Sequence, residues 1–409
     1  MNRVVVTGFG PVTPVGVGAD AFWKALTAGR SGIDRIQRFD PSELPVQIAG
    51  EVRGFSPEEW MKPKEVKRTD RAVHFAIAAA KLAWTDAGEP SVDRARTGVM
   101  FSTGIGGLDS LLKQHLVLLE KGPDRVSPFM VPMLMPNAAA GHVAMAFGFT
   151  GPNACITTAC AAGSHAVGEA FRLIKYGLAD VCIAGGTEAS ILPLTVAGFA
   201  QMQALTRNPD PASASRPFDK NRNGFVLSEG AGALVLEEAD RAVARGARIY
   251  AEVGGYGASA DAYHITAPEP EGLGAIQALQ AALEEAGEPA DAVDYINAHG
   301  TSTQLNDAAE TRAIKKALGD HAYRAAVSST KSMTGHMLGA AGAVEAGVAA
   351  MAIQTGLMPP TINYETPDEE CDLDYVPNEA RQGQVRLALS NAFGFGGHNA
   401  VVALRRFEA

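Results

Sequence analysis

The chain has 409 residues, which exceeds the roughly 250–300 residues at which one hydrophobic core usually stops growing, so we expect two domains or two closely fused halves. Hydrophobic residues make up 46% of the chain and charged residues 20%, a composition that excludes the disordered class of protein. The formal net charge of −10 argues against nucleic acid as a partner, because phosphate binding needs a basic face.

The amino-terminal segment MNRVVVTGFG predicts a first strand at 4–6. It lacks the basic segment, the long apolar segment and the small-residue cleavage site of a secretory signal. The two most apolar stretches, 129–147 and 338–353, are interrupted by proline, histidine or glutamate, so neither suits a membrane span. We therefore expect a cytoplasmic protein with no membrane partner.

Short β-branched runs that end in glycine alternate along the chain with alanine-rich segments of helical periodicity. In chain order they predict strand 4–6, helix 72–86, strand 99–101, helix 161–176, strand 181–184, helix 275–286, strand 295–297, helix 342–354 and strand 387–389. Alternating strands and helices of this kind indicate a layered α/β fold.

A weak internal repeat accompanies this alternation. The segment VTGFG at 6–10 resembles VGGYG at 253–257, and AAG at 161–163 resembles AAG at 340–342. The two offsets differ, so insertions must separate the copies, and matches this short also arise by chance. We interpret them as two similar halves, 1–250 and 251–409, with the boundary near residue 250.

Four cysteines occur, with no CxxC pair, so the sequence predicts neither a zinc site nor a disulfide framework. Cys160, in TTACAAG at 157–163, directly precedes a helical pattern. A helix amino terminus stabilises a thiolate through its free N–H groups and its dipole, so Cys160 is the candidate nucleophile. A buried structural cysteine is the alternative, and we assign it to Cys155, Cys182 and Cys371.

Two histidines lie in glycine-flanked turns after predicted strands, His299 in NAHGTST at 297–303 and His336 in SSTKSMTGHMLG at 328–339. Either one alone is more typical of a satisfied polar residue than of a catalyst. Lys331 lies among small hydroxyl residues at a strand end, a setting that indicates a buried lysine in need of an acidic partner. Glu345, which interrupts an alanine-rich helix, is the candidate partner.

The segment NAFGFGGHN at 391–399 packs three glycines and two phenylalanines into one turn. Such a loop can present backbone N–H groups to an oxyanion and an aromatic lid to a pocket. Nucleotide binding is not expected, because GFG at 8–10 does not continue as the dinucleotide fingerprint and the chain has no GxxxxGK[ST] motif.

The longest motifs are RVVVTGFGPVTPVG, TACAAGSHAVG, ASRPFDKNRNGFVLSEGAG, NAHGTSTQLND, SSTKSMTGHMLGAAGAVE and NAFGFGGHN. In these motifs and in their order, over essentially the whole chain, the sequence resembles the β-ketoacyl-[acyl-carrier-protein] synthases of type II fatty acid synthesis, most closely their synthase II branch. The combination is far more specific than any single short motif.

The resemblance implies an acyltransferase that condenses an acyl group, carried on Cys160, with malonyl-ACP to give β-ketoacyl-ACP, CO₂ and free ACP. His299 and His336 match the catalytic histidines, and Lys331 with Glu345 matches a supporting pair. Such a Cys-His-His set differs from the Cys-His-Asn set of initiating synthases and from the second cysteine of thiolases. Phe395 matches the gate, and the N–H groups of Cys160 and Phe395 match the oxyanion hole.

The resemblance also implies further substrate-binding residues, namely Ile105, Thr301, Thr303, Gly394, Phe395 and Gly396. Thr301 and Thr303 match contacts to the phosphopantetheine arm, and Ile105 matches the pocket residue typical of synthase II. His398 stands where many of these synthases have threonine, and its role stays open. The implied fold is the thiolase fold, with duplicated five-layered α/β/α/β/α halves in a homodimer. No metal or cofactor is implied, because the phosphopantetheine is carried by the ACP substrate.

Acyl-ACP and malonyl-ACP are the implied partners. Because such carriers are acidic and this chain is itself negative, docking needs a local basic patch. The candidates are Lys64, Lys67, Arg68, Arg125 and Arg207, each of which is nearly as typical of a solvated surface charge. Two other functions stay open: a chain-length factor, which usually lacks the cysteine, and a condensing enzyme of polyketide assembly.

Overall fold

Two sets of five strands repeat the same order and directions in the computed structural model, which describes residues 1–408. The first set runs β1 (Val4–Thr13), β8 (Gly230–Glu238), β7 (Val181–Glu188), β5 (Thr97–Ser102) and β6 (Asn153–Ala154). The second runs β9 (Ala251–Ala260), β15 (His398–Arg405), β14 (Leu387–Gly394), β10 (Tyr295–Asn297) and β11 (Ala326–Ser328). In each set the first two pairings are antiparallel and the last two parallel. Pairing of β1 with β9 joins the two sets.

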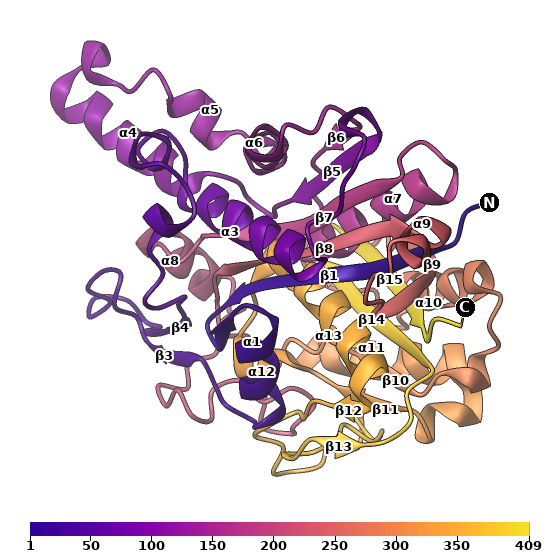
Figure 1. The fold of residues 1–409 in the computed structure, drawn as a ribbon. Helices are drawn as coiled ribbons and strands as arrows, with labels where there is room; N and C mark the ends of the chain where they lie inside the picture. The colour runs from indigo at the N-terminus through magenta and orange to yellow at the C-terminus, as the bar shows by residue number, and fades with distance from the viewer. Residues whose placement is uncertain (409) are drawn as a thin grey trace.

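Helices form three layers around these strands (Figure 1). The central layer is α7 (Ala162–Lys175) and α13 (Ala341–Thr355), which pack on each other and on strands of both sets. Outside the first set, α3 (Arg71–Asp86) packs on β1, β7 and β8. Outside the second set, α10 (Leu273–Ala286) packs on β9 and β15, with α11 (Gln304–Leu318) beside it. This confirms the five-layered, duplicated thiolase fold that the resemblance implies.

The short sequence repeat comes from equivalent places in the two halves. VTGFG lies in β1 and VGGYG in β9, and each AAG leads into a central helix. A single 3-10 turn precedes each of these helices, η4 (Ala159–Ala161) before α7 and η7 (Leu338–Ala340) before α13. Both turns start on a non-glycine residue with positive φ, 49° at Ala159 and 46° at Leu338. The boundary near residue 250 stays a prediction.

Close packing explains why the central layer is rich in alanine and glycine. A Cβ on Gly163 would lie 2.6 Å from the backbone nitrogen of Ala343, and one on Gly347 would lie 2.1 Å from the ring of Phe9. The segment Leu338–Thr355 is long and apolar enough to cross a membrane, but 89% of it is buried inside the protein. Its apolar character therefore belongs to a core helix.

The remaining elements are short or peripheral. The helices are α1 (Ala19–Thr27), α2 (Pro63–Val66), α4 (Leu108–Lys121), α5 (Met130–Leu134), α6 (Ala138–Phe147), α8 (Pro193–Gln201), α9 (Ala239–Ala244) and α12 (Lys331–Thr334). The strands are β2 (Gly16–Val17), β3 (Ile33–Arg35), β4 (Ile48–Gly50), β12 (Leu357–Met358) and β13 (Arg381–Gln382).

Candidate active site

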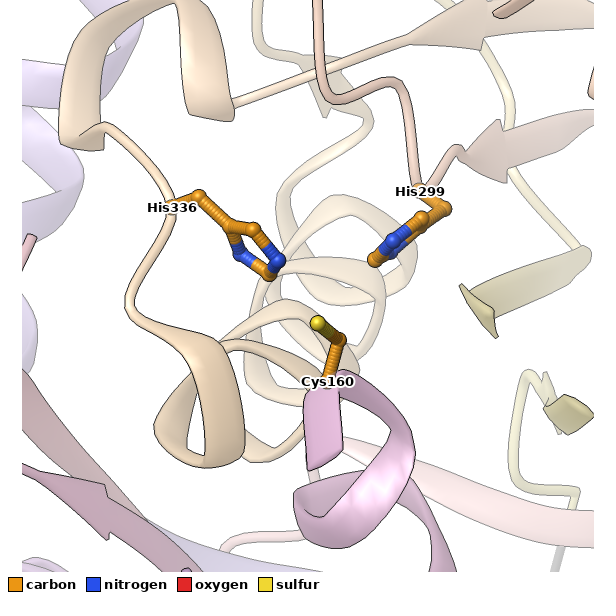
Figure 2. A group of neighbouring side chains, drawn as sticks. All are labelled: Cys160, His299 and His336. Atoms are coloured by element: carbon orange, nitrogen blue, oxygen red, sulfur yellow. The ribbon is translucent and has the colours of Figure 1, made fainter. Parts of the chain in front are cut away.

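Three side chains from separate segments converge at one point. Cys160 lies in η4 at the start of α7, His299 follows β10, and His336 follows α12. The cysteine sulfur and one ring nitrogen of each histidine lie within 4.8 Å of one another. Figure 2 shows both imidazole rings facing the sulfur of Cys160. The fold therefore brings together the cysteine and the two histidines that the sequence singled out.

The turn that carries Cys160 is packed tightly against the glycine-rich hairpin between β14 and β15. A Cβ on Gly394 would lie 2.7 Å from the carbonyl oxygen of Thr158, so only glycine fits there. The backbone N–H groups of Phe395 and of Cys160 itself act on the sulfur and lower the pKa of its thiol. These are the two donors that the resemblance assigns to an oxyanion hole.

The pKa of the Cys160 thiol is raised, whereas the sequence predicts a thiolate and so a lowered pKa. Burial raises this pKa to about 12, against the lowering by the charge of Lys331 and by the two N–H groups. The side chain is only 6% exposed, so the loss of hydration outweighs the favourable groups around it. The resting sulfur is therefore a neutral thiol. Among the other cysteines, Cys182 and Cys371 are buried as expected, whereas Cys155 is half-buried.

This pKa leads to a pH prediction. Because only the thiolate reacts with iodoacetamide, the alkylation rate of Cys160 is expected to rise about tenfold per pH unit from pH 7 to pH 9, without a plateau. The measurement is mass spectrometry of the alkylated peptide over time. A plateau below pH 8 would instead mean that the start of α7 stabilises the thiolate, as the sequence alone predicts.

Both histidines are neutral in this setting. Burial is the main cause that brings the pKa of His299 and of His336 well below 6.5, and the charge of Lys331 adds to it. Among residues 1–408, the Nδ1 atoms of both rings and the Nε2 atom of His336 are buried with no hydrogen-bond partner. Neutral rings with unused nitrogen atoms are suited to donate hydrogen bonds to a bound thioester oxygen.

The predicted partnership of Lys331 and Glu345 is present. The lysine Nζ lies 2.5 Å from Oε1 of Glu345, and each side chain is only 1% exposed. Burial raises the pKa of Glu345 to about 7, although the lysine charge opposes this shift. Removing one partner of such a buried pair typically costs about 3–5 kcal/mol of folding free energy, because the other charge is left uncompensated.

Two positioning groups were not found by sequence reasoning. Glu310 of α11 accepts hydrogen bonds of 2.8 Å from the backbone N–H groups of His299 and Gly300. Arg222, only 2% exposed, donates to the carbonyl oxygens of Thr303 and Gln304. Glu310 falls on the same helical face as buried alanines, so the helical periodicity of the sequence could have indicated that it is buried. No local pattern indicates the role of Arg222, because the two carbonyl groups that it holds near the site are more than 80 residues away.

A cavity of about 1070 Å³ opens onto the three side chains. It is lined by the predicted residues Ile105, Thr301, Thr303, Gly394 and Phe395 and by Arg207. One side is apolar, because Cys160 packs with Ile105 and Leu338. The other side is polar, where the hydroxyls of Thr301 and Thr303 lie 3.0 Å apart.

Two other residues near the hairpin stand apart from the cavity. Gly396 does not line it in the part of the chain that the structure describes, and its N–H donates instead to the carbonyl of Ile265 at 2.7 Å. Its substrate contact therefore stays a prediction. His398 lies near His165, whose pKa falls to about 4 mainly through burial and also through that neighbour.

One group of side chains and several single buried oxygens offer donor atoms for a metal ion. The sulfur and nitrogen atoms of the Cys160, His299 and His336 group are of the type that zinc prefers. Buried oxygens of Asn297, Ser390, Asn391 and Glu345 have no hydrogen-bond partner within residues 1–408, and such oxygens suit a hard cation. The expectation of no metal stays a prediction.

Comparisons with known proteins agree with this geometry. Residues 1–242 match the beta-ketoacyl synthase N-terminal domain and residues 250–365 the beta-ketoacyl synthase C-terminal domain. The chain is similar to "3-oxoacyl-[acyl-carrier-protein] synthase 2" of Synechocystis sp., with 54% identity over 100% of this chain and 99% of that protein. It is also similar to the protein of the same name from Coxiella burnetii, with 50% identity over 99% of both chains. A solved structure of a type II polyketide acyl-carrier protein in complex with its hexaketide-bound ketosynthase has 35% identity, a TM-score of 0.92 and full coverage of both chains.

Proposed function

The chain belongs to the beta-ketoacyl synthase family, and from that premise we propose that it is an acyltransferase that elongates acyl chains in type II fatty acid biosynthesis. The reaction is a decarboxylative Claisen condensation of the acyl group with malonyl-ACP. The observation that carries the proposal is the convergence of Cys160, His299 and His336 in the wall of a large cavity. The relatives of about 50% identity named synthase 2 support the elongating branch.

In the first half-reaction, the sulfur of Cys160 attacks the carbonyl carbon of an acyl-ACP thioester. The tetrahedral oxyanion is held by the N–H groups of Cys160 and Phe395. The thiol proton passes through water to the departing carrier sulfur. Free ACP leaves with its own phosphopantetheine thiol, and the acyl chain lies on the apolar side of the cavity, beside Ile105 and Leu338. No cofactor of this protein enters the step.

In the second half-reaction, malonyl-ACP places its arm beside Thr301 and Thr303. His299 and His336 donate hydrogen bonds to the thioester oxygen while the carboxylate leaves as CO₂ and enolate charge develops. The enolate carbon attacks the acyl carbonyl on Cys160. The bond to sulfur breaks, the Cys160 thiolate takes up one proton from solvent, and the product is a β-ketoacyl-ACP two carbons longer. Loss of CO₂ makes the condensation favourable.

The proposal is tested by mixing the protein with a saturated acyl-ACP and then with malonyl-ACP. We expect one acyl mass on the protein, followed by its transfer to a β-ketoacyl-ACP. A protein that gains no acyl mass would be a non-catalytic partner subunit instead. The polyketide alternative, which the ketosynthase neighbour favours, predicts repeated extension without reduction. A product extended once, by two carbons, would exclude the polyketide alternative.

We propose that acidic carriers dock on exposed basic side chains, and the candidates for this basic patch are Lys64, Lys67, Arg68, Arg125 and Arg207. All five side chains are exposed, and Arg207 lies at the cavity. The guanidinium of Arg68 stacks over the ring of Phe129 at 4.6 Å, which brings the α2 segment beside the segment that contains Arg125. Reading this patch as a docking surface rests on charge complementarity.

Replacing Arg68 by alanine is expected to lower kcat/KM for carrier-bound substrates by about 2- to 5-fold, the size of one exposed charge contact. The effect should shrink at high salt, because salt screens exposed charges. Alkylation of Cys160 should not change. Arg324→Ala, an exposed arginine of the second half, is the matched control. Equal effects of the two substitutions would remove Arg68 from the docking surface.

We also propose a homodimer in the cytoplasm, formed across strand β6. This strand ends the sheet, and both of its residues are exposed. Helices α4, α5 and α6 follow one another on the same side of the molecule as β6 (Figure 1). Large apolar side chains are exposed on these helices, including Leu119, Val131 and Met145. An unpaired edge beside exposed apolar surface is typical of an interface.

Light scattering is expected to give twice the mass of one chain. Met145→Glu should shift that mass toward the monomer, because a charge would be buried in the interface. Val243→Glu, an exposed apolar residue on α9, serves as the control. A monomeric wild-type protein would refute the dimer.

A further inference from the structure

Glu188 is a buried acid that the mechanism above does not use. It is the last residue of β7 and is fully buried. Its Oε2 atom accepts hydrogen bonds from the backbone N–H of Gly104 at 2.9 Å and of Gly339 at 3.1 Å. Its Oε1 atom accepts from the hydroxyls of Ser190 at 3.0 Å and Thr103 at 3.2 Å. The carboxylate thus has four donors from three segments.

The two backbone donors belong to segments that form part of the wall of the active-site cavity. Gly104 precedes Ile105, and Gly339 follows Leu338, and all but Gly339 line the cavity. These segments touch closely, because a Cβ on Gly339 would lie 2.2 Å from the backbone nitrogen of Gly104. A Cβ on Gly104 would lie 2.7 Å from Oε2 of Glu188. The acid therefore lies directly behind the apolar wall and binds both of its segments.

Because the fold is duplicated, the contact between Glu188 and Gly339 can be compared with the equivalent position in the other half. Gly339 holds the middle position of η7, as Cys160 holds the middle position of η4. At Cys160 the corresponding N–H group is left to a substrate oxygen. At Gly339 the equivalent N–H group is occupied by a carboxylate oxygen from the protein itself. Glu188 thus takes, in one half, the place that a substrate oxyanion takes in the other.

We propose that Glu188 is a positioning residue for acyl-chain specificity, which holds the Gly104–Ile105 segment against the Leu338–Gly339 turn so that the apolar wall fits a long acyl chain. This inference rests on the proposed acylation of Cys160. A long chain lies along Ile105 and Leu338, whereas a short one reaches little beyond Cys160. Loosening the wall therefore affects long substrates more than short ones.

The role needs an acceptor oxygen rather than a negative charge. Burial raises the pKa of Glu188 to about 7, and both protonation states keep Oε2 as an acceptor for the two N–H groups. A glutamine side chain has the same shape, and its NH₂ group can donate to the hydroxyls of Ser190 and Thr103, which can turn to accept. Glu188→Gln is therefore the conservative variant, and Glu188→Ala removes the acceptor.

The test compares wild-type protein, Glu188→Ala and Glu188→Gln in the acylation of Cys160 by butyryl- and myristoyl-pantetheine, followed by intact-protein mass spectrometry. For Glu188→Ala we expect the myristoyl rate to fall by about tenfold or more and the butyryl rate by less than about threefold, because sub-ångström misplacement of a positioned chain is costly. Sodium formate should restore the myristoyl rate by filling the vacated site. Glu188→Gln should keep the wild-type ratio of myristoyl to butyryl rates, because the charge of Glu188 raises the pKa of Cys160 alike for both substrates.

Equal losses for both chain lengths, with no response to formate, would overturn the proposal and leave Glu188 a structural residue. An unchanged myristoyl rate in Glu188→Ala would overturn it as well. If Glu188→Ala does not fold, Glu188→Asp replaces it, because the shorter acid must draw the two segments out of place and should show the same chain-length bias. Failure of the proposed function is seen separately, as a wild-type protein that gains no acyl mass.

Discussion

Replacing Cys160 by serine is expected to lower the condensation rate by about 10⁶-fold, the loss typical of a removed catalytic nucleophile. The buried thiol already has a pKa of about 12, and a serine hydroxyl is a much weaker acid and a poorer nucleophile in the same place. No acyl mass should appear on the variant after incubation with acyl-ACP. Intact-protein mass spectrometry measures the acyl mass, and chromatography of the carrier measures the product.

The matched control is Cys155→Ser, which changes a half-buried cysteine outside the catalytic group. It should keep full acylation. The malonyl half-reaction offers a second check, because loss of CO₂ from malonyl-ACP depends on His299 and His336 and should persist in Cys160→Ser. Condensation by the variant within tenfold of the wild-type rate would show that the nucleophile lies elsewhere.

Replacing His336 by alanine is expected to lower malonyl decarboxylation by about 10²–10³-fold, the loss typical of one removed oxyanion donor. Its ring is neutral, buried and unpaired, and so is available to the thioester oxygen. Acylation of Cys160 should fall much less, because backbone N–H groups hold that oxyanion. Release of labelled CO₂ measures the first half of this prediction, and the acyl mass on the protein measures the second.

His115→Ala, on the exposed side of α4, is the matched control and should change neither rate. The pH dependence gives an independent test. Because the pKa of both histidines lies well below 6.5, the neutral donors persist above that pKa, and decarboxylation should not decline between pH 8 and pH 6.5 through their protonation. Equal losses of acylation and decarboxylation in His336→Ala would mean that the histidine mainly maintains the fold of the site.

Much of the fold followed from local patterns. All five predicted strands and all four predicted helices are present, because β-branched runs and alanine-rich periodicity are properties of neighbouring residues. Strands β8 and β15 were not predicted, since nearly all of their residues are buried and little alternation marks them. Helix α11 was not predicted because its buried face includes Asp307 and Glu310, whose partners come from other segments.

The sequence by itself determined the chemical groups of the site: a cysteine before a helix, two histidines in glycine-flanked turns, and a lysine that needs Glu345. These depend on residue type and local order. Only the tertiary structure decided how the groups behave. Burial makes Cys160 a neutral thiol, Gly396 turns toward Ile265, and Glu188 occupies the N–H group of Gly339. Hydration and hydrogen bonding at these residues are set by segments distant in the chain, which no local pattern encodes.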